Sequence, residues 1–191
     1  MNYYIPYATK TVSISGTVNN ANGIKTSVAT VASPVTYSSF NGTLGGTFSV
    51  PRTVSFTSTS HSSSYVSAST IVFHGTDING AVITETLHNS TANGGETVVG
   101  SLGFLTVTSI VVAAQADTAG AYTFGVRDIV CSSQCADIRV GTTGNLKVGY
   151  PDGTTDTIPN VIAGEHLPYG PSIIYGDSST TIQNITIAFK V

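Results

Sequence analysis

The residues best suited to metal binding or nucleophilic chemistry are two cysteines and four histidines. Cys131 and Cys135 lie four positions apart in the segment CSSQC. A structural zinc ion takes four thiolate, imidazole or carboxylate ligands, and the sequence has no second cysteine pair to complete a zinc-binding set. We therefore expect no zinc site. The two cysteines are expected to be free thiols or to form a local disulfide with each other, and a reducing compartment would oppose the disulfide. The histidines are isolated from one another in the sequence, at His61, His74, His88 and His166.

Two of these histidines flank one predicted β-hairpin. His74 precedes its turn and His88 follows its second strand. The two imidazoles could approach each other across the hairpin, where they would bind a metal or respond to pH. The alternative is that both are ordinary polar residues at strand ends.

The sequence offers no convergent set of catalytic groups. It contains no Gly-x-Ser-x-Gly segment of the kind that presents a nucleophilic serine. A glycosidase needs two carboxylates facing each other across a cleft, but most of the ten acidic residues fall in or beside predicted turns. Glu85 lies within an alternating strand and is predicted to face solvent. We expect a protein that is not an enzyme and that has no cofactor.

Two acidic turns resemble fragments of calcium-binding loops. They are Asp77-Ile78-Asn79-Gly80 and the segment from Asp152 to Asp156. Calcium takes six to eight oxygen ligands, and neither segment supplies that many. We expect ordinary turns in which aspartate accepts hydrogen bonds from its own backbone.

Composition limits the classes of partner. Charged residues make up 9% of the 191 residues, the formal net charge is −3, and the seven lysines and arginines are scattered singly. This leaves no basic patch for a phosphate backbone, so we expect no nucleic-acid partner. No apolar run is long enough to span a bilayer, and the first residues lack the pattern of a secretory signal. We expect no membrane partner and synthesis in a cytoplasm, alone or as part of a larger assembly.

The elements that position these residues are predicted to be β-strands throughout. Threonine, valine and isoleucine alternate with polar residues, which favours half-buried strands. Turn signals recur roughly every 8 to 12 residues, which is typical of sandwiches and jelly rolls. We predict an all-β protein: an antiparallel, jelly-roll-like β-sandwich at 11–128, followed by a small β-module at 129–191. An aromatic arm at 1–10 precedes them.

The final third carries a distinctive order of turns. Val140-Gly141 leads through Gly144-Asn145-Leu146 to a hairpin at residues 152–155, and a corner follows at Asn160-Val161, Ala163-Gly164 and Leu167-Pro168. This pattern resembles the small β-module of the head spike base proteins of tailed phages and gene transfer agents. The resemblance implies a virion protein of the head vertex or head surface, where an oligomer seats a fibre or cements capsomers.

We therefore expect a non-enzymatic virion structural protein, assembled in a host cytoplasm, that acts through subunit contacts as a decoration, cement or spike base protein. Its expected partners are further copies of itself, a major capsid protein or other virion proteins, and a fibre. A tail or baseplate component and a glycan- or receptor-binding sandwich are the alternatives. The residues expected at an interface come from the aromatic arm and the matched corner: Tyr3, Tyr4, Tyr7, His166, Leu167, Tyr169 and Tyr175.

Overall fold

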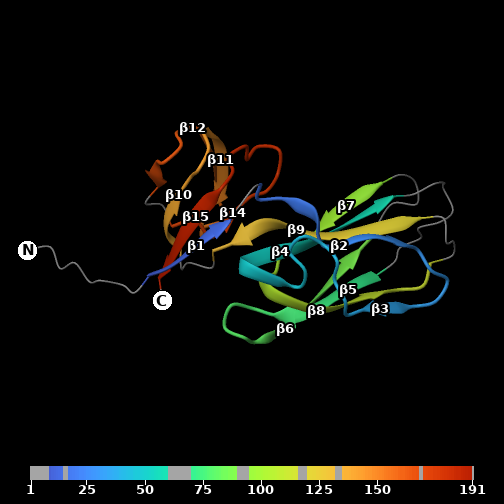
Figure 1. Cartoon of the computed structure of the whole chain (residues 1–191). Coiled ribbons are helices and arrows are strands. Elements are labelled where there is room, and N and C mark those ends of the chain that lie inside the picture. The colour runs from blue at the N-terminus through green and yellow to red at the C-terminus, as the bar shows by residue number, and fades with distance from the viewer. Residues whose placement is uncertain are drawn as a thin grey trace, which may run out of the picture. The chain divides into compact units, whose positions relative to one another are not determined.

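The protein is an all-β protein, as the sequence predicts. The computed structural model describes residues 9–14, 17–59, 70–89, 95–115, 120–131, 135–167 and 170–190, and every regular element in these ranges is a β-strand (Figure 1). The strand pairs in the described residues are antiparallel. They form one sheet in the order β1-β15-β10-β13 and a larger one that contains the order β12-β11-β14-β9-β4-β8-β5-β6. None of the described residues belongs to a helix that could cross a membrane.

The strands have the following bounds along the chain: β1 Thr9–Ile14, β2 Asn20–Ala29, β3 Val35–Tyr37, β4 Thr47–Thr59, β5 Thr70–Thr76, β6 Val82–His88, β7 Glu96–Val99, β8 Phe104–Val112, β9 Ala121–Val130, β10 Cys135–Arg139, β11 Gly144–Gly149, β12 Thr155–Val161, β13 His166–Leu167, β14 Ile173–Ile174 and β15 Ile185–Lys190.

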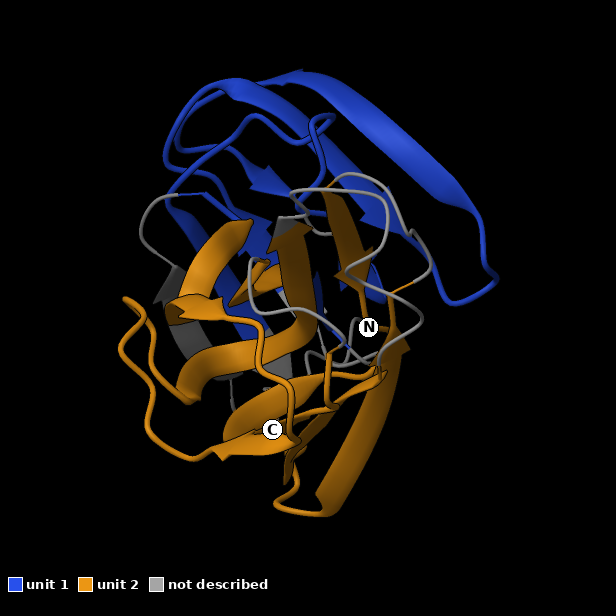
Figure 2. Cartoon of the chain, turned by 90° about the vertical axis from the view of Figure 1, so that its right-hand side faces the viewer, with its two compact units in different colours: residues 1–18, 128–191 blue, residues 19–127 orange. Residues whose placement is uncertain are grey.

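The chain divides into two compact units that are coloured separately in Figure 2. Unit 1 comprises residues 1–18 and 128–191, and unit 2 comprises residues 19–127. The predicted division placed residues 11–128 in a single domain, and the structure corrects its beginning. Strand β1 pairs along its whole length with β15, from Thr9 opposite Lys190 to Ile14 opposite Ile185. Long-range strand pairing of this kind leaves no local signal in the sequence.

Unit 2 is the β-sandwich, and an aromatic cluster fills its core. Phe73 in β5 and Phe124 in β9 meet edge to face with their ring centroids 6.0 Å apart. Neither strand is the other's hydrogen-bonded neighbour, so this contact joins opposite layers of the sandwich. Phe56 in β4 meets Tyr122 in β9 in the same geometry. Edge-to-face pairs stabilise a core beyond the apolar area that they bury.

The alternation of buried residues along the strands explains why this sequence forms a sandwich. In β5 every second residue is buried, as expected for a strand with one face on the core. In β6 exposed and buried residues also alternate, but Glu85 is buried on the same face of the strand as Leu87. The prediction that Glu85 faces solvent is therefore wrong. Its Oε1 atom accepts hydrogen bonds from the N–H and hydroxyl of Ser101, at 2.6 and 3.1 Å, and from the N–H of Leu102. These donors offset the cost of burying a carboxylate.

Unit 1 contains the four-stranded sheet and the shorter strands β11, β12 and β14. The end of β9 contributes to it as well, because Val130 and Ile129 pair with Ile173 and Ile174 of β14. Buried aliphatic side chains from both groups of strands supply its core: Ile129, Ile138, Val140, Leu146, Val148, Val161, Leu167, Ile174, Ile182, Ile185 and Ile187.

A matched pair of valines tests the core of unit 2. Val54 in β4 is completely buried, whereas Val82 at the start of β6 is 82% exposed. We expect Val54→Ala to lower the free energy of unfolding by about 2 kcal/mol, because two buried methyl groups are lost and a cavity remains. Val82→Ala should change it by less than about 0.5 kcal/mol. Urea denaturation followed by circular dichroism measures both, and equal effects would contradict this description of the core.

Candidate functional site

The polar side chains that come together in unit 1 lie on one face of the four-stranded sheet. His166 in β13 is directly opposite Arg139 in β10, and Leu167 is opposite Ile138. Side chains alternate between the two faces of a strand, so Ile138 and Leu167 face the core while Arg139 and His166 face solvent. Asp137, two residues before Arg139, lies on this same outer face.

His166 and Asp137 form a hydrogen-bonded pair across β10 and β13. The His166 Nδ1 atom lies 2.8 Å from Asp137 Oδ2, and the two side chains are 61% and 35% exposed. A carboxylate in this position favours a proton on Nδ1 and fixes the orientation of the ring. Within the described residues, no hydroxyl or thiol forms a hydrogen bond with the other ring nitrogen of His166. The pair is therefore not extended into a nucleophilic triad there.

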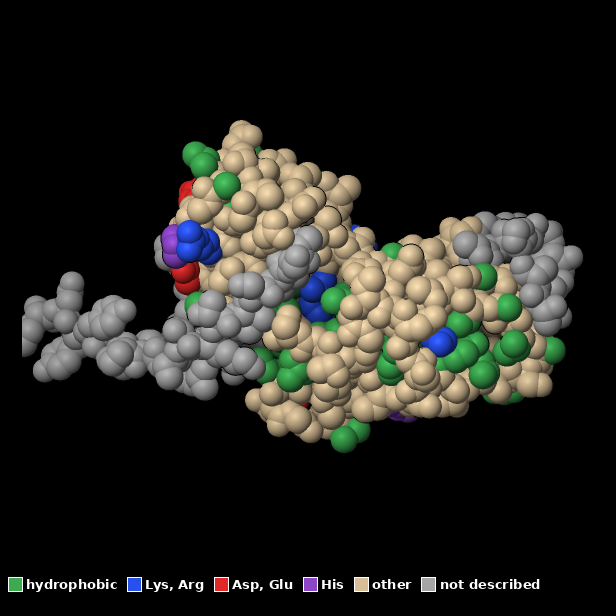
Figure 3. Space-filling model, viewed as in Figure 1, with side chains coloured by type: hydrophobic (Ala, Val, Ile, Leu, Met, Phe, Trp, Pro, Cys, Tyr) green, Lys and Arg blue, Asp and Glu red, His purple; other side chains and the backbone are tan. Residues whose placement is uncertain are grey.

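The same polar face continues onto the next strand. Arg139 is opposite His166 on one side and opposite Thr186 of β15 on the other. Directly opposed residues on neighbouring strands point to the same face, so the three side chains form a row across β13, β10 and β15. In Figure 3, basic, histidine and acidic side chains gather in one place on a surface that is otherwise mostly uncharged.

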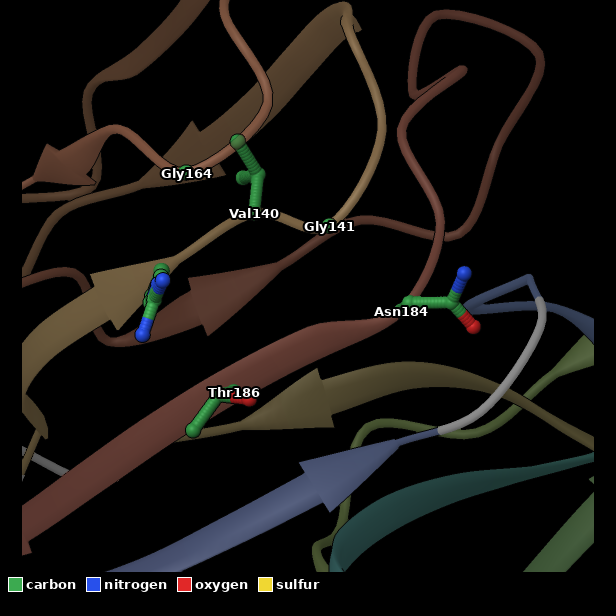
Figure 4. A pocket seen from close by; sticks show the side chains of 6 residues that line it. Val140, Gly141, Gly164, Asn184 and Thr186 are labelled. Atoms are coloured by element: carbon green, nitrogen blue, oxygen red, sulfur yellow. The ribbon is translucent and has the colours of Figure 1, made fainter.

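A hollow of about 260 Å³ opens beside this row. Figure 4 shows Val140 and Gly141 just after β10, Gly164 in the turn before β13, and Asn184 and Thr186 on the chain that enters and continues in β15. Arg139 completes the lining. The hollow lies entirely within unit 1, and three of its lining residues, Val140, Gly141 and Gly164, belong to the motif of the spike-base resemblance.

The corner between β12 and β13 is held by several hydrogen bonds that its backbone N–H groups donate to side-chain oxygens. Asn160, whose φ is 54°, donates its N–H to Asn145 Oδ1, and Ala163 donates its N–H to Thr143 Oγ1. The N–H of Ile162 donates to Glu165 Oε2 at 2.9 Å. Gly164 has a φ of 88°, a left-handed conformation that glycine adopts without strain.

The structure locates three of the residues that we predicted at an interface. His166 lies on the outer face of the sheet, as described above. Leu167 does not offer its side chain to a partner, because it is 4% exposed and faces the core opposite Ile138. Tyr175 is half-buried. The other predicted residues lie outside the described part of the chain: Tyr3, Tyr4, Tyr7 and Tyr169.

Tyr175 belongs to a local cluster that already occupies one face of its ring. The Lys147 Nζ atom lies 4.9 Å from the ring centroid, which is a cation–π contact. The same ammonium group donates a hydrogen bond of 2.6 Å to Asp177 Oδ2. Lys147 thus covers one of the two ring faces on which a sugar or an aromatic partner could stack.

Sequence reasoning missed Asp137, Arg139, Asn184 and Thr186. The alternation in Asp137-Ile138-Arg139-Val140 could have placed the first and third residues on an exposed face. Their juxtaposition with His166 and Thr186 depends on pairing with β13 and β15, which lie far along the chain.

The hypothesis of a histidine pair in the hairpin of β5 and β6 is wrong. The register places His88 opposite Thr70 and His74 opposite Thr84, so the two histidines lie at different levels of the hairpin. The His74 Nδ1 atom is 3.1 Å from Thr84 Oγ1. No three potential ligands among histidine, cysteine, aspartate and glutamate group together in the described parts of the chain.

The acidic turns are confirmed as ordinary turns. Asp77 Oδ1 accepts hydrogen bonds from the N–H groups of Asn79 and Ala81, and Asp152 Oδ1 accepts them from the N–H and hydroxyl of Thr154. These bonds from Thr154 lower the pKa of Asp152. The side chain of Cys131 is buried, whereas the side chain of Cys135 is not described.

Comparisons with known proteins give little guidance. No protein-family model and no curated protein matches this chain. A crystal structure described as that of a "putative secreted protein" from Parabacteroides distasonis ATCC 8503 aligns over 96% of this chain and 81% of its own, with 7% identity and a TM-score of 0.25. A similarity of this size indicates neither fold nor function.

The pair of Lys147 and Asp177 should make the stability of unit 1 depend on pH. Burial alone would raise the pKa of Asp177, but hydrogen bonds from Lys147 and Ser179, together with the charge of Lys147, lower it below its usual 3.8. A lowered pKa in the folded state adds stability above the unfolded pKa, and this stability is lost as pH falls through the folded value. We expect Asp177→Asn to cost roughly 1 kcal/mol at pH 7.

The difference between wild type and Asp177→Asn should shrink as pH falls below 3.8, the usual pKa of an aspartate. Chemical denaturation at a series of pH values measures it. Asp156→Asn is the control, because Asp156 is exposed and no hydrogen bond to its side chain is found among the described residues. A difference that stayed constant to pH 2 would show that the effect of Asp177→Asn does not come from its charge.

Proposed function

We propose that this protein is a non-enzymatic structural subunit of a virion. In this proposal it decorates or cements the head or forms the base of a head spike, and its unit 1 makes the contacts with neighbouring subunits. Its partners are further copies of the same chain, a capsid protein or other virion proteins, and a fibre. Assembly takes place in the cytoplasm of the host.

The observation that carries the proposal is the corner before β13. Several residues of the resemblance to spike base proteins meet there, among them Val140, Asn145, Asn160 and Gly164. The side chains of Thr143, Asn145 and Glu165 accept hydrogen bonds from backbone N–H groups of this corner. This corner presents Ile162, which is 65% exposed. A large aliphatic side chain on a braced turn loses little conformational entropy on binding, which makes it a suitable anchor at an interface.

The low charge of the surface supports the same proposal. Charged residues are depleted from the cores of protein interfaces because their desolvation is costly. Only 9% of the residues of this chain are charged, and the face shown in Figure 3 is dominated by uncharged groups. Large parts of this surface would therefore lose water cheaply against a neighbouring subunit.

The alternatives differ in how far the structure favours them. A tail or baseplate component would use the same kind of contact at another position in the virion. A glycan- or receptor-binding role would need aromatic faces open to a ligand. The contact of Lys147 with Tyr175 works against that role at this tyrosine, and no other observation supports it.

A matched pair of variants tests the proposed contact. Ile162 in unit 1 and Val82 in unit 2 are both large exposed aliphatic residues. We expect the wild-type protein to form a closed oligomer, as is usual for structural subunits, and Ile162→Asp to shift it to monomers because a charge would be buried at the contact. Val82→Asp should leave the oligomer intact. Light scattering after size-exclusion chromatography, over a hundredfold range of concentration, gives the masses.

The outcomes separate assembly from the position in a virion. A wild-type protein that stayed monomeric at every concentration, or an oligomer that tolerated Ile162→Asp, would contradict the proposed contact. Placement in a virion is tested independently by sedimenting particles through a density gradient and identifying peptides of this chain by mass spectrometry. Absence of the chain from intact particles would overturn the virion role.

A further inference from the structure

Among the described charged side chains on the outer face of the four-stranded sheet, Arg139 is the one without a partner for its charge. Its guanidinium forms no hydrogen bond or ion pair with any residue that the structure describes. Arg139 is exposed, yet it lines the hollow beside β10 rather than a convex surface. A guanidinium at the wall of a hollow can bind an anion that also contacts other lining residues.

The two carboxylates that neighbour Arg139 in the sheet have other partners. Asp137, two residues earlier in β10, is hydrogen-bonded to His166 at 2.8 Å. Glu165, next to the residue opposite Arg139, accepts the N–H of Ile162. These contacts leave Arg139 without an internal counter-ion, although acidic side chains lie close to it in the fold.

The rest of the hollow has the size and the groups to receive a small polar ligand. Thr186, Asn184 and Val140, which is 1% exposed, also line the hollow. The Asn184 amide points away from the other labelled lining residues in Figure 4. Gly141 permits the close approach of the walls, because a Cβ at this position would lie 2.6 Å from the Cβ of Asn184. At about 260 Å³, the hollow is at the lower limit of ligand pockets, which suits a short side chain or a small acid and not an oligosaccharide.

We infer that this hollow is a carboxylate-binding site in which Arg139 forms a bidentate ion pair with the ligand. The planar guanidinium matches the two oxygens of a carboxylate, and such charge-assisted pairs are stronger than neutral hydrogen bonds. Thr186 and Asn184 border the same hollow. The ligand is a carboxylate on a short aliphatic chain, either a free organic acid or an acidic side chain on the surface of another polypeptide.

A carboxylate fits the site better than a phosphate does. The lining supplies a single cation, and two acidic residues, Asp137 and Glu165, lie in the adjoining part of the sheet. Their negative charges oppose a dianion more strongly than a monoanion. A monovalent, planar ligand is therefore the better match.

The experiment is a titration of the ¹⁵N-labelled protein, followed by amide chemical shifts, with sodium acetate and with N-acetyl-glutamate amide. Sodium chloride keeps the ionic strength constant, and acetamide is the neutral control. We expect saturable shifts at Gly141, Gly164 and Thr186. Similar affinities of the two probes would indicate that the ligand is a free acid. Binding of the glutamate derivative that is several-fold tighter than that of acetate would indicate a side chain of a polypeptide.

Substitutions at Arg139 distinguish the proposed pair from a general effect of anions. Arg139→Gln should weaken binding at least about tenfold, because a hydrogen-bonded ion pair is lost. Arg139→Lys keeps the positive charge but not the planar guanidinium that forms two parallel hydrogen bonds, so it should have an intermediate effect. Arg127→Gln is the matched control, since it removes an arginine from unit 2. Thermal unfolding of each variant establishes that it is folded.

Three results would each overturn the inference. The first is that the shifts do not saturate or are equally produced by acetamide or chloride. The second is that Arg139→Gln binds the probes as tightly as wild type does. The third is that inorganic phosphate binds as tightly as the carboxylates, which would show that the site does not prefer a planar monoanion.

Discussion

Unit 1 depends on the pairing of β15 with both of its neighbours. This strand lies between β1 and β10, so its backbone N–H and C=O groups are satisfied on both sides, as the backbone groups of a buried strand require. Its side chains point alternately to the two faces of the sheet: Ile185 and Ile187 are buried, and Thr186 lines the hollow. The outer row of His166, Arg139 and Thr186 exists only because β15 and β13 are both registered against β10.

Because so few residues of this chain are charged, the surroundings of each charged side chain are informative. A buried or constrained ionic group is costly unless it has a partner, and most of those described here have one. Glu85 accepts three hydrogen bonds from the segment at 101–102, Asp177 is bound by Lys147, and Asp137 is bound by His166. Arg139, which is exposed, has no such partner among the described residues.

Local patterns predicted most of the fold and little of the site. The alternation of β-branched and polar residues predicted strands, and Asp77 and Asp152 predicted turns, because both signals depend on residues close together in the sequence. Glu85 shows where the pattern fails: its strand alternates, but polarity alone did not reveal that a neighbouring segment supplies its hydrogen-bond donors. Likewise the contact of His166 with Asp137, and the position of Leu167 in the core, depend on a register between distant strands that no local signal encodes.

The pairing of Thr9 with Lys190 also has a consequence for the synthesis of the protein. Residues 19–127 form a unit by themselves and are interposed between β1 and the rest of unit 1. On the ribosome, this interposed unit has all of its strands as soon as residue 127 has left the exit tunnel, and domains generally fold as units during translation. Strand β1, although made first, must wait for β15. Unit 1 can therefore form all of its strand pairs only after β15 has been made, and contacts between such distant segments close large loops. Until then, β1 is an unpaired edge that a chaperone or a neighbouring nascent chain can bind.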